Sequence, residues 1–144
     1  MSESRVSEHD KRVVAERAGG CCEYCRSQAR FSSDSFSIEH IKPRVRGGVS
    51  DPTNLALSCQ GCNNRKFTST EALDPASGQL APLYNPREHR WSEHFAWNED
   101  FTLLVGLTPI GRATIAKLAL NRVAVVNLRR VLSNAGEHPP ALPT

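Results

Sequence analysis

The chain has 144 residues, of which 39% are hydrophobic and 23% charged, and a formal net charge of +3. This composition is typical of a folded soluble protein and excludes a largely disordered chain, while the small positive charge favours anionic partners only weakly. The polar start, MSESRVSEHDKR, lacks the apolar stretch of a signal peptide, and no segment approaches the roughly 20 apolar residues of a membrane helix. We therefore expect a cytoplasmic protein that does not contact a membrane.

The first predicted element is a helix from Val6 to Ala18. Ser7 is suited to cap its start, Val13 and Val14 give it part of an apolar face, and Gly19-Gly20 ends it. We expect residues 1–20 to pack on the remainder of the protein through this helix.

Four of the five cysteines form two pairs with the same spacing, Cys22-Glu23-Tyr24-Cys25 and Cys59-Gln60-Gly61-Cys62. A two-residue gap lets both thiolates of a pair face one ion, and two pairs supply the four sulfur ligands of structural zinc. Gly61 is suited to a tight turn inside the second pair. Redox-active or merely buried thiols are the alternatives, but redox pairs usually occur singly. We expect Zn²⁺, with Cys21 outside the site.

Residues 26–58 separate the pairs, more than the roughly 15–20 residues of a simple zinc ribbon, so a further unit is inserted between them. The pattern predicts, in order, a strand over Phe36–Ile41 that ends before Pro43, a loop with turn signals at Gly47-Gly48 and Asp51–Asn54, a second strand over Leu55–Leu57, and a helix beginning near Asn63.

The run CEYC, followed by IEHIKPRVRGGVSDPTNLALSCQGCNNRKF, resembles the HNH endonuclease family. The resemblance extends from about Cys22 to Phe67 and rests on the order of its parts: the acidic-His pair, the Pro and Gly-Gly, the Asn-Leu, the CxxC, and the Asn and Lys after it. It is closest in kind to small stand-alone bacterial members with two CxxC zinc knuckles. It implies an α+β fold with a zinc-stapled ββα-metal core over residues 21–72.

The resemblance also implies roles for single residues. His40 would be the general base, and Asn54 would orient it. Asn63 stands in the third position, where many members carry His, and Glu39 stands where the family often has Asp; both would bind a catalytic divalent cation. Oxygen ligands of this kind suit Mg²⁺ or Mn²⁺.

Each of these residues also has an ordinary interpretation. Glu39 and His40 are compatible with a packed or solvated pair at a strand end, Asn54 with a turn residue, and Asn63 with a helix cap. Nearby basic side chains are either phosphate contacts or part of a solvated loop. We expect them to bind nucleic acid: Lys42, Arg44, Arg46, Arg65 and Lys66.

The C-terminal half predicts a different organisation. Prolines and a glycine indicate a linker over residues 73–90. The extension over residues 91–134 is predicted to hold a hairpin of Trp91–Trp97 and Phe101–Val105, a helix from the Thr108-Pro109 start to about Leu120, and a second helix near Val123–Leu132. We expect residues 135–144 to be a disordered tail.

The extension is similar to a tail of small stand-alone bacterial HNH proteins, which implies no specific role. Its conspicuous side chains have open interpretations. His89 and His94 are either metal ligands or ordinary residues, and Trp91 and Trp97 either packing residues or base-stacking platforms. Four arginines indicate either a face for DNA or a solvated face: Arg112, Arg122, Arg129 and Arg130.

We therefore expect a metal-dependent endonuclease that hydrolyses phosphodiester bonds in DNA, preferably double-stranded, with one structural zinc and one catalytic cation. The alternative is a zinc-stabilised nucleic-acid-binding module without cleavage activity. A zinc protein that only binds another protein is a third possibility. The sequence leaves monomer and homodimer, DNA and RNA, and the target site open.

Overall fold

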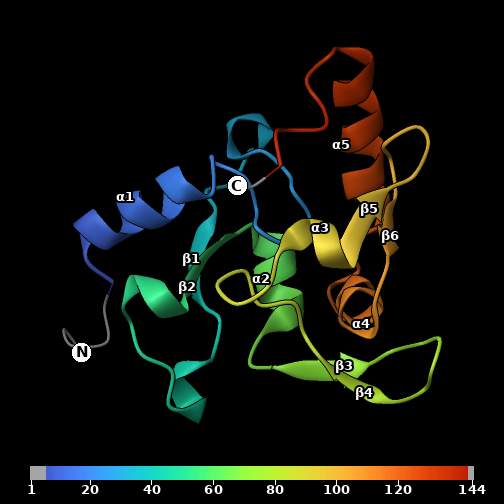
Figure 1. The fold of residues 1–144 in the computed structure, drawn as a ribbon. Coiled ribbons are helices and arrows are strands. Elements are labelled where there is room, and N and C mark those ends of the chain that lie inside the picture. The colour runs from blue at the N-terminus through green and yellow to red at the C-terminus, as the bar shows by residue number, and fades with distance from the viewer. Residues whose placement is uncertain (1–5, 143–144) are drawn as a thin grey trace.

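A computed structural model describes residues 6–142 (Figure 1). The regular elements are, in order, α1 (Glu8–Arg17), β1 (Ser37–His40), β2 (Leu55–Ser58), α2 (Gln60–Lys66), β3 (Glu71–Leu73), β4 (Leu80–Pro82), α3 (Trp91–His94), β5 (Phe95–Trp97), β6 (Leu104–Gly106), α4 (Pro109–Leu118) and α5 (Val123–Asn134). Single 3₁₀ turns occur at Ala29–Phe31, Arg44–Arg46 and Pro52–Asn54. The strands form small antiparallel pairs, β1–β2, β3–β4 and β5–β6, so the predicted α+β class is confirmed.

The predicted strand–loop–strand–helix unit is present as β1, β2 and α2. β1 pairs with β2 so that His40 lies opposite Leu55. α2 begins before the predicted start near Asn63, because Cys59 is its N-cap and its Sγ accepts the amide of Cys62 at 3.5 Å. The thiol that is available to a metal therefore also starts the helix.

The N-terminal helix is capped as expected, since Ser7 Oγ accepts the amide of Asp10 at 3.0 Å. Val14 on α1 packs with Leu55 and Leu57 of β2 in a small apolar cluster. This packing places α1 beside β2 (Figure 1).

The expected linker over residues 73–90 is not a plain linker, and this part of the prediction is wrong. It contains the turn and second strand of the β3–β4 hairpin, and Leu83 after β4 is buried. Asp74, at the hairpin turn, accepts two hydrogen bonds of 2.9 Å from Arg112 of α4. Pro75 and Gly78 mark the hairpin turn correctly, but Pro82 lies in β4, and Leu83 and Tyr84 after it join the core.

The hairpin predicted for residues 91–105 forms later along the chain than expected. Residues 91–94 form α3 instead of a strand, which lets Trp91 and Phe95 pack together with ring centroids 5.3 Å apart. β6 begins at Leu104 rather than Phe101, because Asn98 Oδ1 accepts the amides of Thr102 and Leu103 and lengthens the turn. Thr108 caps α4 as predicted, through its Oγ1 and the amide of Gly111.

The expectation of a disordered tail is wrong for residues 135–142. The carbonyl of Glu137 accepts from Gln28, and the carbonyl of Ala141 accepts from Arg26 at 3.2 Å. The ring of His138 lies against Trp97 with centroids 4.7 Å apart. These contacts attach the tail to the segment after the first cysteine pair and to β5. Residues 1–5 and 143–144 lie outside the described part of the chain.

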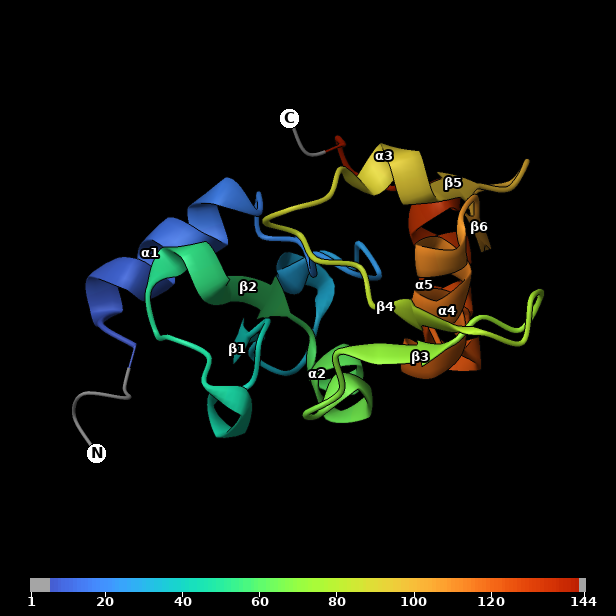
Figure 2. The same ribbon diagram turned by 60° about the horizontal axis from the view of Figure 1, so that its bottom comes forward.

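One apolar core joins the β1–β2–α2 unit and its two cysteine pairs to the extension. Figures 1 and 2 place α1 and β1–β2 on one side, α4, α5 and the β5–β6 hairpin on the other, and α2 between them. The buried members of this core come from both sides: Cys22, Tyr24, Cys25, Ile41, Ala56, Cys59, Cys62, Leu83, Tyr84, Trp91, Phe95, Leu104, Leu118 and Leu120. Within residues 6–142, no helix combines the length and apolarity needed to span a bilayer.

Candidate metal centre and active site

The four predicted zinc ligands converge although the two pairs are far apart in sequence. The sulfur atoms of Cys22, Cys25, Cys59 and Cys62 all lie within 4.8 Å of one another, and all four residues are buried and free of disulfides. The sulfurs of Cys25 and Cys59 are 3.7 Å apart. A tetrahedron with Zn–S bonds of about 2.3 Å has edges of about 3.8 Å, so the donor set fits zinc. Cys21 lies outside the group, as expected.

Arg122, which precedes α5, covers this cysteine group from the side of the extension. Its Nη2 lies 3.4 Å from Sγ of Cys59, and its Nη1 lies 3.6 Å from Sγ of Cys62. A Cβ at Gly61 would come within 2.5 Å of the guanidinium. Gly61 has no positive φ, so the expected turn role is wrong, and the glycine instead leaves room for Arg122.

His40 stands at the end of β1, where the strand leaves the β1–β2 pair. Its Nε2 lies 2.9 Å from Oγ of Ser50, which belongs to the following loop. Partial burial lowers the pKa of the imidazole below its ordinary value of 6.5, and the charges of Arg44 and Lys66 lower it further. The ring is therefore neutral, and able to accept a proton, at neutral pH.

Asn54 clamps the loop that follows His40. Its Oδ1 accepts the amide of Lys42 at 2.8 Å, and its Nδ2 donates to the carbonyls of Lys42 (3.0 Å) and Val49 (2.9 Å). These bonds close the loop that contains Ser50, the partner of His40. The expected hydrogen bonding between Asn54 and the loop that begins at His40 is thus confirmed.

His40 and Asn63 line the same shallow hollow, of about 280 Å³, between the end of β1 and α2. Cys59 and Cys62, two of the four converging cysteines, bracket the first turn of α2, and Asn63 follows directly after Cys62. The remaining residues that line the hollow are Ile38, Glu39, Pro43, Arg44, Val45, Phe67 and Thr68.

Residues 22–68 match the family model described as HNH endonuclease. The match spans both cysteine pairs, β1, β2 and α2, and it agrees with the resemblance found in the sequence. We call residues 22–68 the HNH segment. Comparisons of the chain with curated proteins and with solved structures gave no match.

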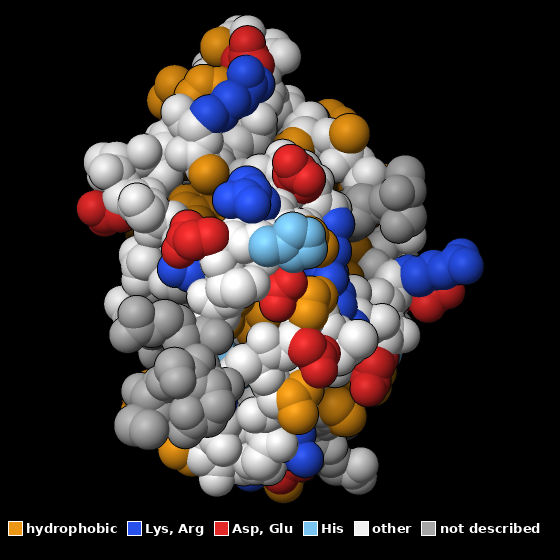
Figure 3. Space-filling view, turned by 90° about the vertical axis from the view of Figure 1, so that its left-hand side faces the viewer, with side chains coloured by type: hydrophobic (Ala, Val, Ile, Leu, Met, Phe, Trp, Pro, Cys, Tyr) orange, Lys and Arg blue, Asp and Glu red, His pale blue; other side chains and the backbone are white. Residues whose placement is uncertain are grey.

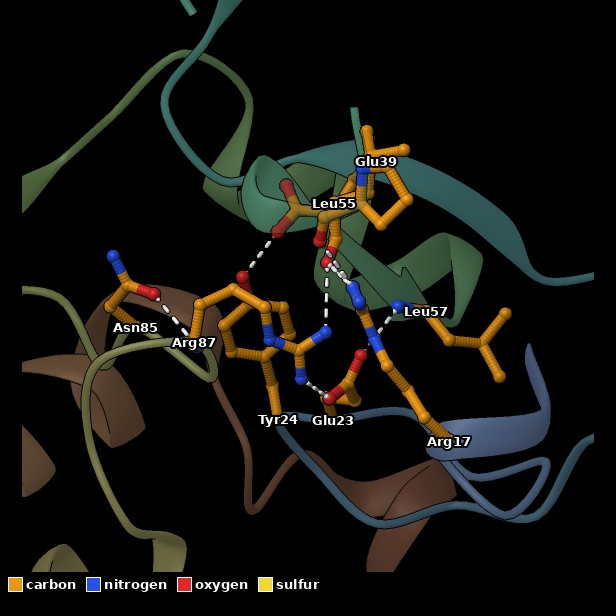
Figure 4. Close-up of polar contacts among 9 residues, drawn as sticks. Arg17, Glu23, Tyr24, Glu39, Leu55, Leu57, Asn85 and Arg87 are labelled. Atoms are coloured by element: carbon orange, nitrogen blue, oxygen red, sulfur yellow. Dashed lines mark hydrogen bonds and ion pairs between the residues drawn. The ribbon is translucent and has the colours of Figure 1, made fainter. Parts of the chain in front are cut away.

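Glu39, the acidic partner of His40 in the HNH segment, has buried partners of its own. Tyr24 donates its hydroxyl to Glu39 Oε1 (Figure 4), and Lys66 Nζ lies 3.3 Å from Oε2. Burial raises the pKa of Glu39, and the ammonium of Lys66 opposes this rise. Glu39 lines the hollow together with His40, but its two carboxylate oxygens are occupied by Tyr24 and Lys66.

Lys66 was expected to contact nucleic acid, and the structure contradicts this. The side chain is 1% exposed, and Nζ also donates to the carbonyl of Ile41 at 2.8 Å. The ammonium therefore holds the end of β1 against α2 inside the HNH segment. A phosphate outside the protein has no access to it.

The other predicted phosphate contacts are on the surface. Lys42, Arg44 and Arg46 lie exposed on the loop after His40, and Arg65 lies exposed on α2. Figure 3 shows acidic and basic side chains interspersed over the left-hand side of the Figure 1 view, where α1 lies.

The extension supplies internal contacts where a basic face was one interpretation. Arg112 binds Asp74, Arg122 covers the cysteines, and Arg129 is buried and donates to the carbonyls of Cys25 and Leu120. Among the four arginines considered, only Arg130 is exposed. His89 and His94 lie with ring centroids 5.1 Å apart, but within residues 6–142 the cysteine group is the only cluster of three or more candidate ligands.

Sequence reasoning missed the side-chain contacts to the edge of β2 that does not pair with β1. Arg17 of α1 and Arg87, which lies between β4 and α3, both donate to the carbonyl of Leu55, and Glu23 accepts from Arg87 and from the amide of Leu57 (Figure 4). Glu23 is a middle residue of the first cysteine pair. No sequence signal indicates this network, because its members come from separate parts of the chain.

Proposed function

We propose that the protein is a metal-dependent endonuclease that hydrolyses phosphodiester bonds in DNA. The observation that carries the proposal is the shared hollow: a neutral imidazole, His40, faces the same space as the amide side chain of Asn63. The exposed side chain of Arg44 also lines this space. A proton acceptor, an oxygen ligand and positive charge are the groups that phosphodiester hydrolysis requires.

In this proposal His40 removes a proton from the water that attacks phosphorus. Ser50 contacts Nε2, and so we assign Nδ1 as the proton acceptor. Asn54 keeps the loop closed and thereby fixes the ring's direction. Lys42, Arg44, Arg46 and Arg65 bind phosphates, and double-stranded DNA is the expected substrate. One such site cuts one strand, so a double-strand break needs a dimer or two events.

The candidate ligands Asn63 and Glu39 fit the proposed catalytic cation, Mg²⁺ or Mn²⁺, only in part. Asn63 offers a hard amide oxygen in the hollow, whereas the Glu39 carboxylate is already shared between Tyr24 and Lys66. We therefore assign Asn63 as the principal ligand and Glu39 as a second ligand only if Lys66 withdraws. When bound, the cation would stabilise the charge that develops on the phosphate and the leaving oxygen.

The pairing of Glu39 with Lys66 also favours a second candidate, a zinc-stabilised module that binds nucleic acid without cleaving it. A carboxylate neutralised by a buried ammonium attracts a cation less strongly. In that case the same basic loop would bind DNA, and His40 would be a surface residue.

The test is a supercoiled-plasmid assay with purified protein in EDTA, Mg²⁺ or Mn²⁺. The nuclease predicts nicking that requires added metal and disappears in His40→Ala, while zinc content and circular dichroism stay normal. Asn64→Ala, which changes an exposed residue of α2, is the matched control and should nick normally. DNA binding without nicking under any metal would establish the binding module. Undiminished nicking by His40→Ala would refute the assignment of the base.

A further inference from the structure

Two large apolar side chains project into solvent at the mouth of the hollow. Val45, in the loop after His40, is 82% exposed, and Phe67, directly after α2, is 77% exposed. Both line the hollow with His40 and Asn63. Neither belongs to the two apolar core clusters of the described residues, so packing inside the protein does not explain them.

Phe67 also has a backbone conformation that is unusual for a bulky residue. Phe67 ends α2 with φ at 49° and ψ at −117°, while its amide still donates to the carbonyl of Asn63 at 2.9 Å. Glycine adopts positive φ without strain, whereas a bulky residue there is a true outlier. An aromatic ring is thus held in a strained conformation, in water, at the edge of the candidate site. Strain of this kind is most often retained at ligand-binding positions.

The charged residues near Phe67 indicate which class of ligand its ring would contact. Arg44 lines the same hollow, and Arg46 and Arg65 are exposed on the flanking loop and helix. A surface that combines apolar rings with guanidinium groups matches a ligand that combines flat apolar faces with phosphates. Nucleic acids have this chemistry, and bases stack on aromatic side chains once they leave the duplex stack. Proteins also insert apolar side chains between base steps of deformable DNA.

We propose that Phe67, supported by Val45, receives an unstacked base next to the phosphate at His40, and that the preferred substrate is DNA that is opened or easily distorted. The inference rests on the proposed nuclease for the identity of the phosphate, but base binding by Phe67 is measurable without cleavage. Phe67 is a positioning residue in this account, since its ring touches the base and not the reacting atoms.

The test uses two DNA duplexes that differ only by a two-nucleotide mismatched bubble, with 2-aminopurine in the bubble. Wild-type protein should bind the bubble duplex more tightly and change the 2-aminopurine fluorescence. Phe67→Gly should lose about 5- to 140-fold in affinity for the bubble, the range for one base on an aromatic ring. Binding to the regular duplex should change far less. Because glycine relieves the backbone strain, Phe67→Gly should unfold at or above the wild-type temperature.

Phe101→Gly is the matched control. Phe101 is also a non-glycine residue at positive φ (62°) and is 41% exposed, but it lies in the β5–β6 turn and does not line the hollow. Bubble binding by this variant should equal that of wild type. Equal binding of both duplexes by wild type and Phe67→Gly would overturn the inference. A change of oligomeric state in Phe67→Gly, without loss of bubble binding, would also overturn it and assign the ring to a protein contact.

The two proposals fail in different ways. If wild type binds the bubble through Phe67 but never nicks DNA, the base-binding proposal is supported and the nuclease proposal is refuted. If wild type nicks both duplexes equally and Phe67→Gly does the same, the nuclease proposal is supported and the base-binding proposal is refuted.

Discussion

The guanidinium of Arg122 lies 3.4 Å from Sγ of Cys59, although the two residues belong to different halves of the chain. The same side chain also donates to the carbonyls of Leu118 and Ala119 at the end of α4. A ZnS₄ centre carries a double negative charge when all four thiolates bind. Arg122 places a positive charge against two of these sulfurs, so the extension would stabilise a zinc ion bound by the four cysteines.

Replacing Arg122 with Ala should therefore weaken zinc binding by about 10- to 100-fold, the usual effect of losing an outer-shell partner. Zinc transfer to a coloured chelator would measure both rate and extent. Gly61→Ala should act in the same direction, because its methyl group would displace the guanidinium. Arg130→Ala, on the exposed side of α5, is the control. Zinc retention by Arg122→Ala equal to that of wild type would contradict this role.

Glu39 and Lys66 should be coupled in folding stability. They are 5% and 1% exposed, so removing either partner leaves the other charge buried and unpaired. Glu39→Gln and Lys66→Met should each cost about 3–5 kcal/mol of unfolding free energy. The double variant should cost clearly less than the sum, as measured by urea denaturation of all four proteins with zinc bound. Additive losses would mean that the pair is not an interacting unit.

Asn54→Ala should leave the zinc centre intact but loosen the loop after His40, because three hydrogen bonds to that loop disappear. Misplacing a catalytic group by about 1 Å costs on the order of 100-fold in rate, and we expect a loss of nicking of this size. Asn64→Ala is again a suitable control. A normal nicking rate for Asn54→Ala, with zinc content unchanged, would show that loop closure is not needed.

The pH dependence of nicking should follow the lowered pKa of His40. The base form of the imidazole is the active one, so activity is complete above this pKa and falls as the pH drops through it. Because the pKa is below 6.5, nicking should persist at pH values where an ordinary histidine is already protonated. A pH–rate profile at saturating metal would measure this. Loss of activity at or above pH 6.5 would contradict the assigned environment of His40.

The cysteine spacing and the order of the HNH residues were sufficient to predict the convergence of the four cysteines, the β1–β2–α2 unit and the hydrogen bonding of Asn54. These features are local: a two-residue gap determines that two thiolates face one ion, and a cap or turn depends on its nearest residues. The same order of residues placed His40 and Asn63 in one unit, and the structure brings both to the same hollow, while their catalytic roles stay predictions. The placement of α1 and the Thr108 cap followed from similarly local signals.

The tertiary structure decided which charged residues are exposed to solvent and which are buried. Lys66 follows the second cysteine pair, and its sequence context is typical of a surface residue. In the structure it is buried and forms an ion pair with Glu39 of β1. Arg112, Arg122 and Arg129 read as a basic face, yet each is paired with groups from distant parts of the chain. The same difficulty produced the false linker and the false disordered tail. A charged or polar side chain looks alike in sequence whether water or a buried partner solvates it, and only the folded chain brings that partner near.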